Sequence, residues 1–276
     1  MEKWTSVIIP VKNEAHRIKT VIEGLLRQTY RPIEVLFVDG GSTDGTRELI
    51  EYYMNKYSSK DFMIKLLKEE DYGSLRSLPN ARNIGIINAR GNYIVFLDAD
   101  FDLSTDPNAI EKIVTGLRES EHVAITYVPS MHTWIEKHLA LDDIVYYFNG
   151  SKPLHVLCGF RKSIFSRALF DPSLGFREDI DFLARVNTRY TIIDTEVRRC
   201  YIHTLSEFKR QQLWYGRTAP RYYRKVAPRV WWLNIIKSNA VLGMLTFSLM
   251  ATLLHPILSL ITLIFILCFI TVSYTH

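Results

Sequence analysis

The sequence contains few cysteines and no stretch with the composition of a flexible linker between domains. Three cysteines occur among 276 residues, and their odd number and wide spacing argue against a disulfide framework and a cysteine-based metal site. The first residues carry no charged leader before a long apolar run, so we expect no signal peptide. No stretch rich in glycine, proline or serine divides the first 208 residues, and there is no internal repeat. A reducing compartment and one large folded domain over 1–208 are therefore expected.

Charge is absent from residues 238–276, where no Asp, Glu, Lys or Arg occurs. As one helix this segment would be about 55 Å long at about 1.5 Å per residue, whereas the apolar core of a bilayer is about 30 Å thick. Pro256 lies near its middle and favours two short spans. The sequence therefore predicts a transmembrane helical hairpin over 238–276, with a buried hairpin of a soluble protein as the alternative.

Residues 209–237, which we call the basic collar, contain eight basic residues and no acidic one. Three tryptophans and three tyrosines accompany these charges, a composition typical of interfacial helices in the headgroup region of a membrane. Pro220 and Pro228 should divide the collar into short helices. Positive charge beside a span favours the cytoplasmic side, so we expect an integral membrane protein with its large domain there. A solvated basic helix is the alternative, and a nucleic-acid surface is disfavoured because the rest of the chain is net acidic.

Short β-branched runs alternate with helical stretches from residue 6 to about residue 100. This alternation predicts an α/β fold with a mostly parallel sheet flanked by helices. Ligands bind such sheets beyond the carboxyl ends of the strands. Polar loops occupy these positions at 12–14, 39–45 and 98–100.

Two carboxylates, Asp98 and Asp100, follow the apolar run 93–97. Oxygen ligands suit Mg²⁺ or Mn²⁺, which complete their coordination with water and phosphate. Acidic pairs are common on surfaces, so the pattern is weak alone. Its position after a strand predicts a site for a divalent cation that carries a diphosphate.

Five motifs occur in order along the chain: IPVKNE at 9–14, VDGGSTDGT at 38–46, ARNIG at 81–85, FLDAD at 96–100 and GFREDID at 175–181. In this combination, residues 5–205 resemble a family 2 glycosyltransferase with the Rossmann-like GT-A fold. The chain is also similar to membrane-bound members of the minimal cellulose-synthase-like and dolichyl-phosphate-mannose-synthase-like types.

The resemblance implies roles for residues around a nucleotide. Pro10 and Glu14 would lie at the nucleotide pocket, and Asp39 would contact the base. Arg82 would approach the nucleotide or its phosphates, which suits a permanently charged guanidinium. A surface ion pair is the alternative for Arg82 and Glu14.

The resemblance also implies a metal site and a base. Asp98 would lie near the ribose and diphosphate and, with Asp100, would hold Mg²⁺ or Mn²⁺, whose charge can replace a general acid at the leaving group. Glu178 and Asp179 match an acidic pair in which the aspartate is the catalytic base. Inverting transfer needs a carboxylate that takes the acceptor's hydroxyl proton, and we assign Asp179, with Glu178 at the substrate site. An acidic cluster favoured by a helix N-terminus is the alternative, with Asp181 as its third member.

Further residues are assigned by the same resemblance. Gly159 would let the backbone approach the acceptor sugar, and His203 would bind metal or diphosphate, unless it is a plain core or surface histidine. Membrane-bound polysaccharide synthases carry a QxxRW motif, from which QQLWYGR at 211–217 departs in order and spacing. We expect Gln212, Trp214 and Arg217 to close over the diphosphate or acceptor, with interfacial anchoring as the alternative.

The expected function is metal-dependent, inverting transfer of a sugar, with mannose favoured, from a nucleotide-sugar to a lipid-linked (polyprenyl) glycan at the cytoplasmic membrane face. Two spans are too few for an obvious export channel, so single transfer is preferred to processive synthesis. The alternatives are a polyprenyl-phosphate sugar synthase, a nucleotidyltransferase and an inactive membrane scaffold. The expected partners are the donor, the acceptor and membrane lipids, with no nucleic acid.

Overall fold

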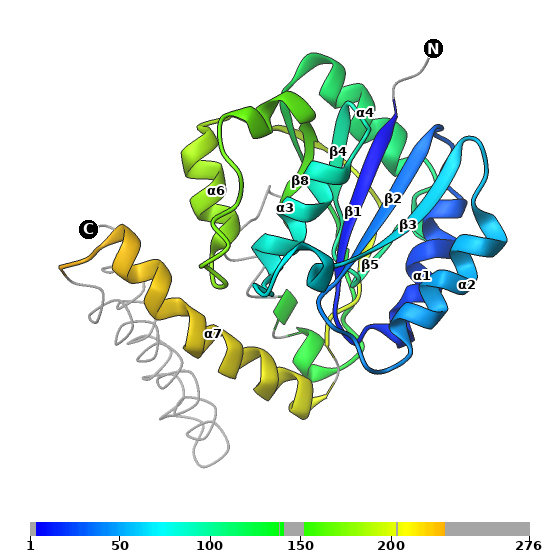
Figure 1. Ribbon diagram of the computed structural model, residues 1–276. Coiled ribbons are helices and arrows are strands. Elements are labelled where there is room, and N and C mark those ends of the chain that lie inside the picture. The colour runs from blue at the N-terminus through cyan, green and yellow to red at the C-terminus, as the bar shows by residue number, and fades with distance from the viewer. Residues whose placement is uncertain (1–3, 138, 141–151, 203, 230–276) are drawn as a thin grey trace, which may run out of the picture. The chain divides into compact units, whose positions relative to one another are not determined.

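The computed structural model describes residues 4–137, 139–140, 152–202 and 204–229 (Figure 1). Residues up to Tyr215 form one compact unit, and residues from Gly216 form a second. The hairpin predicted over 238–276 and the metal ligand predicted at His203 lie outside the described residues. Within the described ranges, no helix has the length and apolar character needed to cross a bilayer.

A seven-stranded sheet with the order β3-β2-β1-β4-β8-β6-β9 forms the centre of the first unit. The four strands from β3 to β4 are parallel, β8 is antiparallel to both of its neighbours, and β9 is parallel to β6. The predicted mostly parallel sheet is therefore confirmed. Its strands are β1 (Thr5–Val11), β2 (Ile33–Asp39), β3 (Phe62–Lys68), β4 (Tyr93–Phe96), β6 (His122–Thr126), β8 (Leu154–Arg161) and β9 (Thr191–Ile193).

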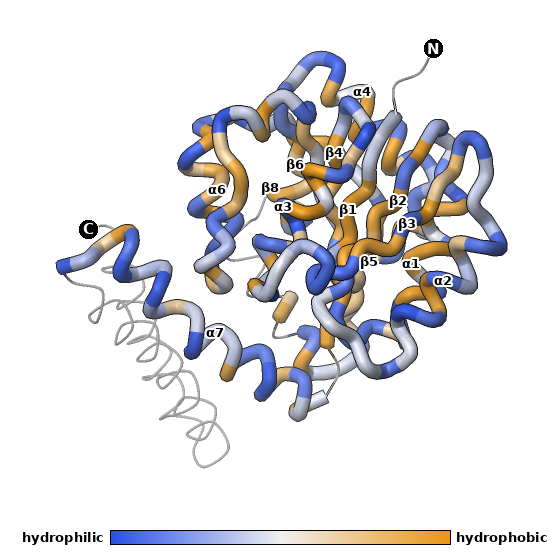
Figure 2. Tube along the Cα trace, in the orientation of Figure 1, coloured by the Kyte–Doolittle hydropathy of each residue, from blue (hydrophilic) through white to orange (hydrophobic). Residues whose placement is uncertain are grey.

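Helices cover both faces of this sheet because its inner strands are apolar on both sides (Figure 2). Along β1, Val7 and Ile9 belong to one buried cluster, whereas Ile8 belongs to the other. The first cluster includes residues of α1 (Ala15–Leu26), α2 (Thr46–Tyr57) and α4 (Ala109–Glu119). The second includes residues of α3 (Leu78–Asn88) and α6 (Glu178–Val186).

A second, three-stranded sheet has the order β5-β10-β7 and follows the Asp98–Asp100 motif. Its strands are only two residues long: β5 (Phe101–Asp102), β7 (Val128–Pro129) and β10 (Arg198–Arg199). Short 3-10 helices lie at Glu69–Tyr72, Leu103–Thr105 and Lys162–Ser166. This small sheet brings residues near 199 to the motif at 98–100.

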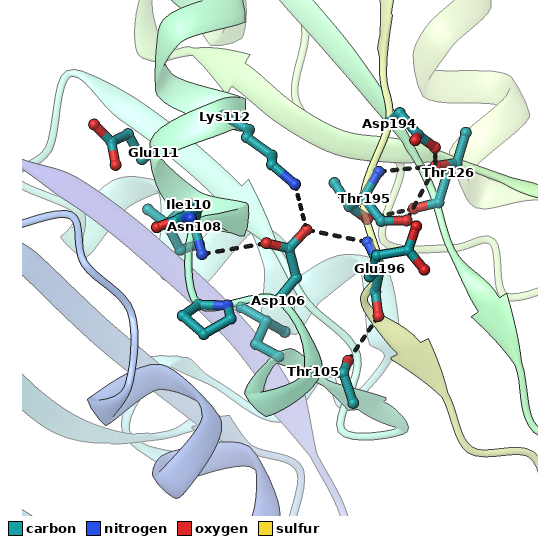
Figure 3. Close-up of polar contacts among 12 residues, drawn as sticks. Thr105, Asp106, Asn108, Ile110, Glu111, Lys112, Thr126, Asp194, Thr195 and Glu196 are labelled. Carbon is teal, nitrogen blue, oxygen red and sulfur yellow. Dashed lines mark hydrogen bonds and ion pairs between the residues drawn. The ribbon is translucent and has the colours of Figure 1, made fainter.

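A polar network fixes the chain just before β10 (Figure 3). The buried carboxylate of Asp106 accepts hydrogen bonds from Lys112 Nζ at 2.7 Å and from the Glu196 backbone N–H at 3.0 Å. Thr126 Oγ1 donates to Asp194 Oδ1 at 2.6 Å. These hydrogen bonds hold the segment 194–196 against α4 and β6, and they therefore fix the position of β10, which follows it.

The longest helix, α7 (Leu205–Val226), contains the first part of the basic collar. It continues through Pro220, so the expected division of the collar there is wrong. Proline removes one hydrogen bond and disturbs one turn, and a helix with turns on both sides of it tolerates this as a local distortion. The helix ends two residues before Pro228.

Candidate active site

Predicted nucleotide-binding residues lie beyond the carboxyl ends of β1 and β2, where a cavity of about 360 Å³ opens. Pro10 and Glu14 line it together with Glu69, Ala81 and Trp214. The sheet edge brings these side chains together because Val11 and Asp39 end neighbouring parallel strands in register. Three of the predicted site residues, Pro10, Glu14 and Trp214, therefore line one cavity.

Glu14 lies at the N-terminus of α1 and lines this cavity. Its backbone N–H donates to Thr46 Oγ1 at 2.9 Å, and its carboxylate pairs with Arg17 at 3.3 Å. An ion pair is thus present at Glu14, but with Arg17 instead of Arg82. Burial raises the pKa of Glu14, Arg17 opposes the rise, and repulsion from Asp100 adds to it.

Asp39 is fully buried at the end of β2 and shapes the following loop. Its Oδ2 accepts from the Gly41 N–H at 3.0 Å and from Arg47 Nε at 2.5 Å, and Oδ1 accepts from the Ser42 N–H at 3.2 Å. Burial raises the pKa of Asp39, but the hydrogen bonds from Ser42 and Arg47 outweigh it, so the pKa lies below its usual value. Contact between Asp39 and a base stays a prediction.

Arg82 on α3 is 4% exposed and bridges two motifs. Its Nη1 lies 2.5 Å from Glu178 Oε1, and its Nη2 lies 3.4 Å from Asp98 Oδ1. The alternative of a surface ion pair is therefore wrong for Arg82, because this pairing is internal. The bridge joins the end of β4 to the first turn of α6.

The two carboxylates that Arg82 joins have pKa values shifted in opposite directions, although burial raises the pKa of both. Burial raises the pKa of Asp98, but attraction to Arg82, and then to His155 and Arg199, outweighs it, so the pKa lies below its usual value. Burial holds the pKa of Glu178 above its usual range, although Arg82 opposes this rise. Asp98 is therefore kept ionised, as a metal ligand requires.

Asp100 has one satisfied and one unsatisfied oxygen. Its Oδ2 accepts from Arg199 Nε at 3.0 Å, whereas its buried Oδ1 has no hydrogen-bond partner among the described residues. An orphaned carboxylate oxygen beside a second carboxylate fits Mg²⁺ or Mn²⁺. In the described part of the chain, no three or more His, Cys, Asp or Glu side chains cluster as a metal site. Asp98 and Asp100 would therefore hold the cation together with diphosphate oxygens and water.

The acidic residues at the start of α6 have three different surroundings. Glu178 is bound to Arg82, and Asp181 pairs with Arg185 at 2.9 Å. Asp179 is half-buried, and its carboxylate accepts from the Ile180 N–H at 2.8 Å. The three do not act as a uniform cluster, and Asp179 alone among them forms no ion pair within the described residues, which suits a proton acceptor.

Gly159 is placed differently from the acceptor role expected of it. It lies buried in β8 between β4 and β6, where it pairs with Val95 and Val123. A methyl group there would come within 2.7 Å of Ile113 Cγ2 on α4. The assignment is therefore corrected: glycine at this position permits helix-to-sheet packing.

The residues predicted in segment 211–217 are divided between the two units. Gln212 is half-buried on α7, and Trp214 lines the cavity. Arg217 is exposed and belongs to the second unit, so its approach to the site stays a prediction.

Two residues near the motif at 98–100 were missed from the sequence. His155 at the start of β8 attracts Asp98, and its buried Nε2 has no hydrogen-bond partner among the described residues. Arg199 on β10 contacts Asp100. No local pattern marks either of them, because strand pairing alone brings them close.

Comparison with known proteins gives the same assignment as these motifs. The family described as "Glycosyl transferase family 2" matches residues 6–170. The minor teichoic acid biosynthesis protein GgaA of Bacillus subtilis strain 168 is 31% identical over 197 residues, which cover 64% of this chain and 42% of that protein. The glycosyltransferase GlyG of Streptococcus pneumoniae serotype 4 is 32% identical over 121 residues, covering 44% and 37%. The chain thus spans less than half the length of these relatives.

Solved structures share the fold at lower identity. The mannosyltransferase PcManGT from Pyrobaculum calidifontis, in complex with GDP-Man and Mn²⁺, matches with a TM-score of 0.57 and 19% identity, covering 82% of this chain and 64% of that one. Staphylococcus aureus TarS 1–349 in complex with UDP matches with a TM-score of 0.53 and 21% identity, covering 72% and 61%. The family match covers more than half of the sequence, and so the chain belongs to glycosyl transferase family 2.

Proposed function

We propose that this chain is an inverting, nucleotide-sugar-dependent glycosyltransferase. The observation that carries the proposal is the Arg82 bridge between Asp98 and Glu178. This bridge supports the proposal because it joins Asp98, a carboxylate suited to a cation, to the helix that carries Asp179. We therefore propose that the donor site and the proton acceptor are adjacent.

In the proposed reaction, Asp179 takes the proton from an acceptor hydroxyl as its oxygen attacks the anomeric carbon. A bond forms between the acceptor oxygen and that carbon, and the bond from the carbon to the diphosphate oxygen breaks on the opposite face. The products are an inverted glycoside and a nucleoside diphosphate. Asp98 and Asp100 would hold Mg²⁺ or Mn²⁺, which supplies positive charge to the departing diphosphate.

The cavity lined by Pro10 and Glu14 is the proposed nucleotide pocket, with Trp214 at its wall. Support for a nucleotide-sugar and a divalent cation comes from structural neighbours that bind UDP, UDP-GlcNAc, or GDP-Man with Mn²⁺. We propose mannose as the sugar on the resemblance to mannosyl-phosphate synthases and on the likeness to PcManGT.

We further propose a lipid-linked polyprenyl glycan as the acceptor, reached at the cytoplasmic face of a membrane. The uncharged residues 238–276 and the basic collar at 209–237 support a membrane anchor beside the catalytic domain 1–208. A relative named for teichoic acid biosynthesis supports a glycan product.

A panel of UDP- and GDP-sugars tests this proposal. The full chain in detergent is incubated with each donor and Mg²⁺ or Mn²⁺, and nucleoside diphosphate release is followed with and without chelator. We expect one donor to be consumed preferentially, with the activity lost on chelation and in Asp100→Asn. If no donor is consumed and none binds in the presence of metal, the proposal is wrong and the scaffold alternative is supported.

A further inference from the structure

Both carboxylates of the 98–100 motif are paired with an arginine in the structure. Asp98 is bound to Arg82 at 3.4 Å, and Asp100 is bound to Arg199 at 3.0 Å. A divalent cation that reached these carboxylates would therefore meet two guanidinium groups already in place. Like charges repel at this range, so the two guanidinium groups compete with a cation for these carboxylates.

The two arginines differ in how firmly they are held. The Arg82 side chain is 5% exposed and is also bound to Glu178, so its movement would leave a second buried carboxylate unpaired. The Arg199 side chain is 27% exposed, and besides Asp100 its Nη1 contacts the neutral Tyr127 hydroxyl at 3.4 Å, so among the described residues its movement leaves no second carboxylate of this kind unpaired. Less free energy is therefore needed to move Arg199 away from Asp100 than to move Arg82 away from Asp98.

The surroundings of Arg199 offer its guanidinium an alternative to Asp100. The guanidinium carbon lies 5.5 Å from the ring centre of Phe101, 5.7 Å from that of Tyr127 and 5.2 Å from that of Tyr201. Aromatic faces attract guanidinium groups, so the charge keeps favourable contacts when it leaves the carboxylate.

The backbone around Arg199 is fixed while its side chain is half-exposed. The Cys200 N–H donates to the Asp100 carbonyl at 2.7 Å, and the Arg199 backbone pairs with Phe101 in the second sheet. The Asp106 network holds the preceding residues (Figure 3). An exchange at Asp100 thus needs only side-chain rotation.

We propose that Arg199 is an internal counter-cation. It forms an ion pair with Asp100 in the metal-free protein, and it leaves Asp100 when a divalent cation binds together with the donor diphosphate. Arg199 is thus a positioning residue that acts through Asp100. Competition from Arg199 lowers the affinity of the site for the metal alone. The diphosphate attracts both the metal and the released guanidinium, so it offsets this loss of affinity. Metal and nucleotide then bind cooperatively. The inference rests on the proposed metal-dependent function.

Direct Mn²⁺ binding to the full chain in detergent tests the inference without any turnover. The affinity is measured by electron paramagnetic resonance of free Mn²⁺, first without nucleotide and then with UDP or GDP. Arg199→Met removes the charge but keeps an apolar stem against the rings, Arg199→Lys keeps a charge, and Asp100→Asn weakens the site itself. Melting temperatures report whether each variant is folded, and Arg199→Gln replaces Arg199→Met if that variant is not.

Without nucleotide, we expect Arg199→Met to bind Mn²⁺ roughly five- to tenfold more tightly than the wild type, as loss of a half-exposed competing charge implies. Arg199→Lys should stay within about twofold of the wild type, Asp100→Asn should bind at least about tenfold more weakly, and nucleotide should strengthen Mn²⁺ binding less in Arg199→Met than in the wild type. A merely structural role for Arg199 would weaken binding.

Unchanged or weaker Mn²⁺ binding in folded Arg199→Met or Arg199→Gln overturns the inference, and wild-type Mn²⁺ affinity in Asp100→Asn overturns it by removing Asp100 from the site. These outcomes are separate from failure of the proposed function. That failure is absence of donor binding and consumption in the wild type, whereas the Mn²⁺ measurement without nucleotide does not use a donor.

Discussion

Arg82 places a permanent positive charge in the interior, between carboxylates that belong to different motifs. Its guanidinium also lies 5.5 Å from the ring centre of Phe170 and 6.0 Å from that of Phe96. A charge in such apolar surroundings is stable only while its partners remain. Arg82 therefore sets the distance between the 98–100 motif and the helix that carries Asp179.

Arg82→Gln should lower the free energy of unfolding by about 3 kcal/mol, because it leaves the buried carboxylate of Glu178 and the partly exposed carboxylate of Asp98 without their partner. Thermal unfolding of the full chain in detergent measures the change. The double variant Arg82→Gln/Glu178→Gln should recover a large part of the loss, since the uncompensated charge on Glu178 is removed as well. Additive losses in the two single variants and the double variant would contradict the bridge.

Individual residues of the site were predictable to different degrees. Asp98 and Asp100 follow directly from their position after an apolar run, because strand ends meet at one edge of a parallel sheet. Arg199 lies about a hundred positions further along the chain, and only the pairing of β10 with β5 brings it to Asp100. Arg82 was recognised as important, but its buried partners could not be read from sequence spacing.

Strand β8 and helix α4 pack closely because Gly159 has no side chain. Gly159→Ala should destabilise the fold by about 1–3 kcal/mol, since its methyl group would overlap Ile113. Combined with Ile113→Ala, the cost should be smaller than the sum of the single effects, as shown by a double-mutant cycle of thermal unfolding. Unchanged stability together with a raised KM for the acceptor would restore the acceptor role of Gly159.

His122, the first residue of β6, is fully buried. The His122 ring stacks on Phe160 with centroids 4.2 Å apart, and its Nε2 lies 2.7 Å from the Val156 carbonyl. Burial lowers the pKa of His122 to about 4, against about 6.5 in an unfolded chain. Between these values the unfolded state binds more protons at His122, so the contribution of His122 to stability falls as the pH falls from about 6.5 to about 4.

His122→Phe should therefore flatten the dependence of stability on pH in this window, by up to about 1.4 kcal/mol per pH unit. Melting temperatures at several values of pH between about 4.5 and 7 measure the slope. His132→Phe is the matched control, because His132 is exposed, and it should keep the wild-type slope. Equal slopes in all three proteins would contradict the assignment to His122.

The alternation of β-branched and helical runs predicted the first half of the fold because β1 and β2 are buried on both faces. The second half was less predictable. Strands such as β5 and β10 have two residues each, too few for a periodic pattern, and they exist because their partners hold them. The helix through Pro220 shows the same limit, since local composition favoured an interruption.

The distribution of charge along the chain separates a net acidic part, residues 1–208, from the basic collar and the uncharged residues 238–276. Deletion of 238–276 should release the protein from membranes, because these residues provide the proposed anchor. Sedimentation with lipid vesicles, with and without the deletion, measures the change. If the shortened chain still sediments with lipid, the anchor lies in the collar instead, and neutral substitutions there should then release it.

The proposed function depends most on Asp179, which we propose accepts the acceptor's proton in a nucleotide-sugar-dependent transfer. The most direct test compares wild type and Asp179→Asn for turnover of the preferred donor and for affinity toward its nucleoside diphosphate. We predict a fall in kcat of at least about 10²-fold to 10⁴-fold, the usual contribution of a general base, with nucleotide affinity within about twofold of the wild type. Retained turnover in a folded Asp179→Asn protein would contradict the account.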